Sequence, residues 1–150
     1  MKNQATLFEY SAFFGSIKIF NYMRINNVKL DSSLWFYAIH GNSPEIIHLL
    51  EENHVKPPEN SNKKLLRESI KCHNNNITNY IKNSLMKNEV DEDHIYISFV
   101  LKNRNISNFP EDFDLDNFAS KYIQTVLFDI VKYDYLYIFQ MIVQKVNMNI

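Results

Sequence analysis

Apolar and polar residues follow one another in a pattern that predicts paired helices along most of the chain. Five isoleucines serve as reference positions: Ile19, Ile46, Ile77, Ile106 and Ile138. Eleven residues before each isoleucine stands a bulky apolar residue, and seven residues before it stands another apolar residue. Because these two positions lie on one face of a helix, the pattern predicts an amphipathic helix before each isoleucine. In four of the five places a second apolar face follows, which predicts a second helix.

A turn is predicted between the two helices of each pair. Four residues before the isoleucines stand Gly15, Asn42, His73, Lys102 and Asp134, none of them apolar. Glycine and asparagine tolerate the left-handed backbone conformation that commonly ends a helix. Pro44 suits the start of the second helix in its pair. Pro110, by contrast, limits the second helix of the fourth pair to about one turn.

The reference isoleucines are 27 to 32 residues apart, although the spacing within each pair is constant. Rigid helix pairs joined by loops of varying length explain this combination. We therefore predict an all-α solenoid of about five stacked helix-turn-helix units in a single domain, residues 1–150, with a bundle of unrelated amphipathic helices as the alternative. The units cover about residues 6–30, 33–56, 64–86, 93–110 and 125–146.

Two segments resemble the ankyrin repeat, whose core runs T-P-L-H-x-A-A-x-x-G-H-x-E-I-V. They are residues 6–20 (TLFEYSAFFGSIKIF) and residues 33–50 (SLWFYAIHGNSPEIIHLL), and the resemblance extends over about residues 6–145. The T-P-L-H opening is never intact and the units are shorter than the usual 33 residues. The chain is most similar to divergent, Asn-rich ankyrin-type arrays of single-celled eukaryotes, with shortened or absent β-turn fingers. A related helix-hairpin solenoid is the second possibility for the fold.

The resemblance implies a scaffold without an active site, which binds a protein partner of unknown identity through the concave face of the stack. The exposed first-helix positions that the family uses for binding fall here on Tyr10, Phe13, Tyr37, His40, Glu68, Lys71, Asp129 and Lys132. Aromatic, histidine and charged side chains of this kind suit a recognition face.

Composition offers little alternative chemistry. The net charge of −1 provides no field to attract nucleic acid, and the two glycines are too far apart for a phosphate-binding loop. Cys72 is the single cysteine, and its neighbour His73 points in another direction on a helix. We therefore expect no catalytic residues, no cofactor and no metal site. The alternative is a helical enzyme or enzyme fragment that uses scattered histidines, aspartates and Cys72.

Residues 126–143 are the most hydrophobic stretch, but charged residues near one end favour a buried helix pair over a membrane span. A membrane-surface role through this stretch is a further alternative. No secretory signal is recognised and the one cysteine is unpaired, so we expect an intracellular protein, cytoplasmic or nuclear. Both ends of the predicted stack are apolar, which predicts either further repeats in a longer array or self-association.

Overall fold

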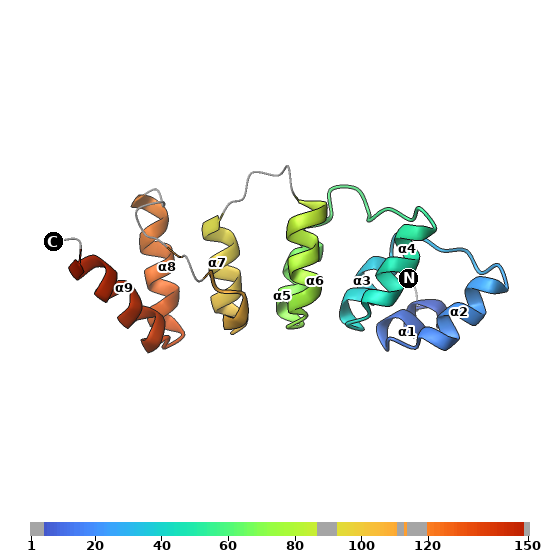
Figure 1. Cartoon of the computed structure of the whole chain (residues 1–150), viewed down its shortest axis with the longest axis horizontal. Helices are drawn as coiled ribbons and strands as arrows, with labels where there is room; N and C mark the ends of the chain where they lie inside the picture. The colour runs from blue at the N-terminus through green and yellow to red at the C-terminus, as the bar shows by residue number, and fades with distance from the viewer. Residues whose placement is uncertain (1–4, 87–92, 111–112, 114–119, 149–150) are drawn as a thin grey trace. The chain divides into compact units, whose positions relative to one another are not determined.

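The computed structural model of the chain describes residues 5–86, 93–110, 113 and 120–148. These residues contain nine α-helices, one π-helical turn and one 3₁₀ turn, and no strand among them is found. The prediction of an all-α protein is therefore confirmed. The helices fall into two compact units, Met1–Asn88 and Glu89–Ile150 (Figure 1).

The first unit consists of three helix hairpins, each made of two consecutive helices joined by a tight turn. The helices are α1 (Leu7–Phe13), α2 (Ile17–Ile25), α3 (Leu34–His40), α4 (Pro44–Glu52), α5 (Asn62–Lys71) and α6 (Asn75–Tyr80), the last continued by a π-helical turn at Ile81–Leu85. The first helices of the hairpins pack side by side, α1 on α3 and α3 on α5, while α2 contacts α4.

The second unit holds two further hairpins. They are formed by α7 (Asp93–Lys102) with the 3₁₀ turn Ile106–Asn108, and by α8 (Ser120–Lys132) with α9 (Leu136–Met148). Helix α8 packs on both α7 and α9. The single 3₁₀ turn before Pro110 confirms that the second helix of the fourth pair is short. Helices α8 and α9 confirm the helix pair predicted for residues 126–143.

All five hairpins turn in the same way. The turn residue has a left-handed backbone at Gly15 (φ 60°), Asn42 (φ 45°), His73 (φ 59°), Arg104 (φ 57°) and Asp134 (φ 58°). In the second hairpin, the Asn42 N–H donates to the Ile39 carbonyl and the Ser43 N–H to the Ala38 carbonyl, both at 3.1 Å. The other four hairpins form the same two hydrogen bonds. This double bond pattern is the Schellman motif, which satisfies the last carbonyls of a helix.

The fourth turn lies two residues later than the sequence pattern predicts. Lys102 is the last residue of α7, and the left-handed residue is Arg104. The reference position four residues after the turn is consequently Asn108, which is buried, and Ile106 is 38% exposed. The alignment on Ile106 was wrong because the buried residue four positions after this turn is Asn108, where the other hairpins have an apolar residue.

Bulky side chains predicted on the inner face of the first helices form the core of the first unit. Phe8, Trp35 and Leu66 are all buried, and the Trp35 indole N–H donates to the Val55 carbonyl at 2.9 Å. Polar links join neighbouring hairpins: Ser33 Oγ donates to Glu9 Oε1 at 2.9 Å, and the Asn74 side-chain amide donates to the Ile39 carbonyl. These hydrogen bonds connect the first hairpin to the second and the second to the third.

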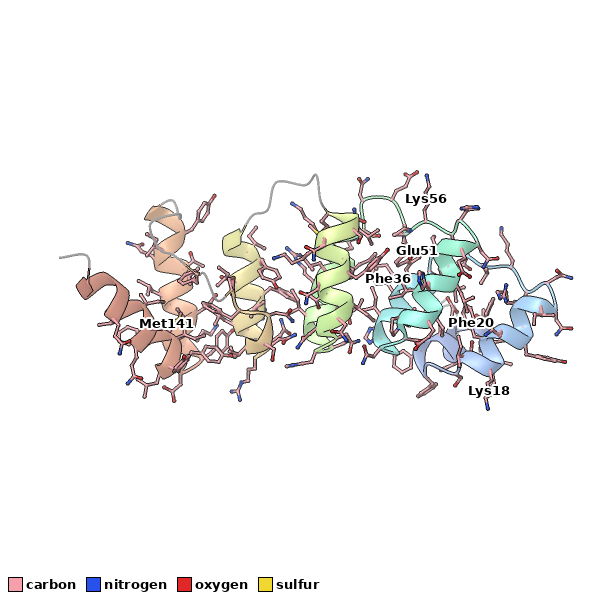
Figure 2. All side chains as sticks on the ribbon, viewed as in Figure 1. Lys18, Phe20, Phe36, Glu51, Lys56 and Met141 are labelled. Atoms are coloured by element: carbon pink, nitrogen blue, oxygen red, sulfur yellow. The ribbon has the colours of Figure 1, made fainter. Side chains whose placement is uncertain are left out.

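The first hairpin departs from the predicted pattern at its reference isoleucine. Ile46, Ile77 and Ile138 are buried, but Ile19 is 51% exposed. Phe20 occupies the core instead, with its ring centroid 4.5 Å from that of Phe8. Figure 2 shows Phe20 directed into the unit and Lys18, two residues earlier on α2, directed away from it.

Exposed apolar side chains gather on the first and last hairpins. Leu7, Phe14, Tyr22 and Ile25 are exposed on α1 and α2 or just beyond α1, as are Phe128, Val131, Leu136 and Tyr137 on α8 and α9. Within the part of the chain that the structure describes, no helix combines the length and the apolarity that a membrane crossing requires.

Candidate functional site

Side chains from α1, α3 and α5 meet in a line that we call the first-helix row: Phe13, His40, Glu68, Lys71 and Cys72. They meet because α1 packs on α3 and α3 packs on α5, which places the C-terminal turns of the three helices next to one another. Phe13 and His40 are the last residues of α1 and α3, and Cys72 directly follows α5.

His40 stands at the centre of the row. Its ring centroid is 5.3 Å from that of Phe13, and its Nε2 atom is 2.8 Å from Glu68 Oε1. The Lys71 ammonium donates to the same carboxylate oxygen at 3.2 Å. The Glu68 carboxylate therefore lies between an imidazole and an ammonium group, both partly exposed to solvent.

The other ring nitrogen of His40 faces a thiol. Cys72 Sγ lies 3.3 Å from His40 Nδ1, so both nitrogens of the imidazole have a partner. Burial raises the pKa of the Cys72 thiol, the Glu68 carboxylate raises it further and Lys71 acts in the opposite direction. The thiol is therefore held in its neutral form at neutral pH.

Of the eight residues predicted to bind a partner, the row brings together Phe13, His40, Glu68 and Lys71. Tyr10 lies on the same helix as Phe13, is half exposed, and stacks on Phe14 with ring centroids 6.3 Å apart. Tyr37, on α3, is partly buried. Burial raises the pKa of Tyr37, and the nearby Glu9, Tyr10 and Asp31 raise it further.

The remaining two predicted residues belong to the second unit. Asp129 and Lys132 are on α8, where Asp129 is partly buried and Lys132 is exposed. The Lys132 ammonium lies 5.1 Å from the centroid of the Tyr133 ring and 5.8 Å from that of Phe128. These distances are typical of cation–π contacts, so Lys132 is engaged with aromatic neighbours of its own hairpin.

Sequence reasoning missed Cys72 as a member of the site. It compared Cys72 with the adjacent His73, whereas the histidine in contact with the thiol is His40, 32 positions earlier. One signal could have found this pair. His40 is six residues before Ile46 and Cys72 is five residues before Ile77, so the two occupy adjoining positions in consecutive hairpins.

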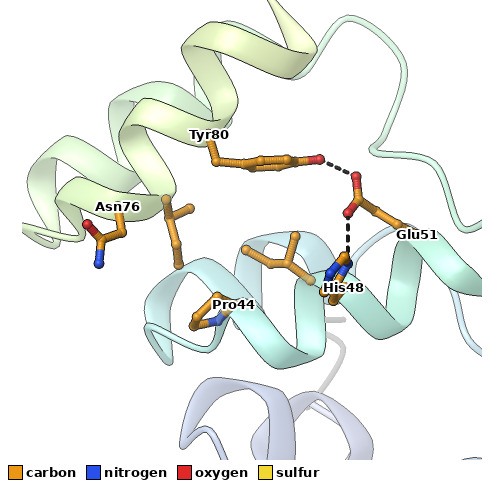
Figure 3. Close-up of a pocket in the computed structure, with 7 residues that line it drawn as sticks. Pro44, His48, Glu51, Asn76 and Tyr80 are labelled. Atoms are coloured by element: carbon orange, nitrogen blue, oxygen red, sulfur yellow. Dashed lines mark hydrogen bonds and ion pairs between the residues drawn. The ribbon is translucent and has the colours of Figure 1, made fainter.

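A hollow of about 220 Å³ lies between α4 and α6, away from the first-helix row. It is lined by Pro44, Ile47, His48, Glu51, Asn76, Ile77 and Tyr80. Figure 3 shows Tyr80 reaching across from α6 to Glu51, which accepts its hydroxyl hydrogen bond and also pairs with His48 at 3.5 Å. Burial raises the pKa of Tyr80, and the hydrogen bond to Glu51 and its charge raise it further. The polar groups of the hollow thus mainly pair with one another.

Comparison with known proteins finds no match among protein-family models, curated proteins or solved structures. The class of the protein therefore rests on its own geometry, which is that of an all-α chain of short helix hairpins.

Proposed function

We propose that this protein is a non-enzymatic interaction module of the ankyrin type. In this proposal the five hairpins are units of one solenoid, which is part of a longer array, and the first helices present a concave face to a protein partner inside the cell, in the cytoplasm or nucleus. The partner is held by shape and side-chain complementarity, without a chemical reaction.

The recurrence of one backbone turn supports the repeat. The left-handed residues of the five hairpin turns are 27 to 31 residues apart, each with the same pair of hydrogen bonds. The same motif also follows α2 and α4, at Asn27 and His54, and it is common at helix ends, so the nearly constant spacing of the hairpin turns is what favours a repeat over a bundle of unrelated helices. The side-by-side packing of α1, α3 and α5 supports stacking within the first unit.

The first-helix row is the observation that carries the partner-binding role. It joins an aromatic ring, an imidazole, a carboxylate and an ammonium group across three consecutive hairpins, with Phe13, His40 and Lys71 open to solvent. Protein interfaces concentrate their binding energy in clusters of aromatic and hydrogen-bonding side chains. The row has this composition and spans more than one repeat.

An enzyme that uses Cys72 is the alternative with a specific observation behind it. Cys72, His40 and Glu68 form a thiol–imidazole–carboxylate chain, the order of groups found in nucleophilic triads. A nucleophilic cysteine, however, needs a lowered pKa. Burial raises the pKa of Cys72, and the thiol follows the C-terminal end of α5, where the helix dipole disfavours a thiolate. We therefore prefer the binding role.

A membrane-surface role through residues 126–143 is less favoured. The left-handed turn at Asp134 divides this stretch between α8 and α9, and four of its apolar side chains are buried: Val126, Ile130, Ile138 and Ile142. Liposome flotation distinguishes this role from protein binding.

Partner capture from a cell extract tests the proposed face. Replacing Phe13 or His40 with alanine is expected to reduce retention of a specifically bound protein by about tenfold or more, the loss typical of a central interface residue. Lys18→Ala and His48→Ala serve as matched controls because both residues are exposed on second helices. If the Phe13 and His40 variants retain the partner as well as the controls do, the first-helix row is not the binding face.

A further inference from the structure

We propose that His40, Glu68 and Cys72 form a binding site for a zinc ion at the end of the first-helix row. Each residue offers one ligand atom, and the three atoms lie within 4.8 Å of one another. Among the described residues this is the group of histidine, cysteine and acidic side chains placed closely enough to share one ion.

One ligand atom from each of the three side chains lies within 4.8 Å of the others, near enough for a zinc ion to draw them together. With zinc–sulfur bonds of about 2.3 Å and zinc–nitrogen or zinc–oxygen bonds of about 2.0 Å, tetrahedral geometry places neighbouring ligand atoms roughly 3.3–3.6 Å apart. Cys72 Sγ is 3.3 Å from His40 Nδ1 and Glu68 Oε1 is 2.8 Å from His40 Nε2, so the two contacts use different nitrogens of the ring, whereas a zinc ion would bind one of them. The side chains of His40 and Glu68 are 33% and 23% exposed, so a rotation at the surface can turn one ring nitrogen towards a shared ion.

The chemistry of the three ligands favours zinc over other common cations. A thiolate and an imidazole suit zinc, whereas magnesium and calcium require a site built of oxygen atoms. The thiolate and the carboxylate together balance the double charge of the ion. Three protein ligands leave the fourth position to water. As the sulfur–zinc bond forms, the Cys72 thiol releases its proton to solvent, so the apparent affinity rises with pH.

The position of the site in the fold also favours a cation. His40 ends α3 and Cys72 directly follows α5, so the last carbonyl groups of two helices are close to the ligands. The negative end of a helix dipole stabilises positive charge. Because the ligands come from two neighbouring hairpins, a bound ion would join α3 to α5 and stabilise the folded first unit.

Titration of the full-length chain with Zn²⁺ and with Co²⁺, under reducing conditions, tests the site. We expect saturable binding of one ion per chain, together with the near-ultraviolet absorption band of a thiolate bound to cobalt. Cys72→Ser is expected to abolish that band, and His40→Ala and Glu68→Gln each to weaken zinc binding about tenfold or more. Circular dichroism of each variant establishes that it is folded.

Two control variants separate this site from simpler chelation. His73→Asn removes the histidine next to Cys72 in sequence and keeps a residue that tolerates the left-handed backbone of the turn, and His48→Ala removes a histidine that pairs with a carboxylate but has no thiol partner among the contacts of the structure. Both are expected to bind zinc as the unaltered chain does. Absence of the thiolate–cobalt band in the unaltered chain, or loss of binding in His73→Asn with full binding in His40→Ala, would overturn the proposal. Neither result bears on partner capture, which is measured without added metal.

Discussion

Replacing Gly41 with alanine is expected to lower the free energy of unfolding of the first unit by about 3 kcal/mol. An added methyl group at this position would lie 2.2 Å from the Ala12 carbonyl oxygen and 2.9 Å from that of Phe13. These atoms are backbone at the end of α1, so the clash is relieved only by moving the first hairpin away from the second. The backbone of Gly41 itself is unstrained, with φ −71°, and space alone requires glycine here.

Urea unfolding followed by the fluorescence of Trp35, the single tryptophan of the chain, measures this loss. Cys72→Ala is the matched control, because Cys72 precedes the left-handed residue of the third hairpin as Gly41 does in the second. The control is expected to change stability by about 1 kcal/mol or less, in the range of ordinary substitutions. A Gly41→Ala protein as stable as this control would mean that the first two hairpins do not approach as closely as described.

Replacing Trp35 with alanine is expected to cost about 3–5 kcal/mol, the range for removal of a large buried aromatic residue. The side chain is 1% exposed, and its indole N–H donates to the Val55 carbonyl after α4. The substitution leaves a cavity in the second hairpin and a carbonyl without its donor. Because small domains are stable by only about 5–15 kcal/mol, much of the stability of the first unit depends on this residue.

Trp35→Phe separates packing from hydrogen bonding. It retains most of the apolar volume and loses the indole donor, so we expect a smaller loss of about 1–3 kcal/mol. Circular dichroism at increasing urea concentration follows both variants, since neither contains tryptophan. Equal losses for alanine and phenylalanine would contradict the packing role of Trp35.

Local rules in the sequence predicted the turns. The pattern predicts Gly15, Asn42 and His73 at the ends of first helices, and all three adopt the left-handed conformation. The signal is strong because few residues suit this backbone, and an apolar residue is disfavoured there. Pro110 is similarly informative, since its ring cannot continue a helix.

Other features depended on tertiary packing that no local pattern contains. Ile19 matches the pattern of Ile46 and Ile77, yet it is exposed because Phe20 fills the core beside Phe8. In the fourth hairpin a buried asparagine, Asn108, stands where the pattern requires an apolar residue. Apolar periodicity therefore selected Ile106 and shifted the alignment by two residues.

The candidate site could be predicted only in part, for a related reason. The resemblance to ankyrin repeats selected Phe13, His40, Glu68 and Lys71 among its eight positions, and these four meet because they lie on helices that pack side by side. It did not select Cys72, which contacts His40 across two hairpins at positions that are not equivalent. Spacing from Ile46 and Ile77 places the two residues at adjoining positions, but whether their side chains meet depends on how far one helix is displaced along the next, which spacing does not contain.

The recurrence of one hairpin along the chain is the central claim, and nuclear magnetic resonance of the backbone tests it most directly. Carbon chemical shifts and N–H to Hα couplings report the sign of φ at each residue. We predict a left-handed backbone at Gly15, Asn42, His73, Arg104 and Asp134. The amide proton of the residue that follows each of them is expected to exchange slowly. Right-handed or extended values at two or more of these five residues would contradict the recurrent hairpin and the binding face derived from it.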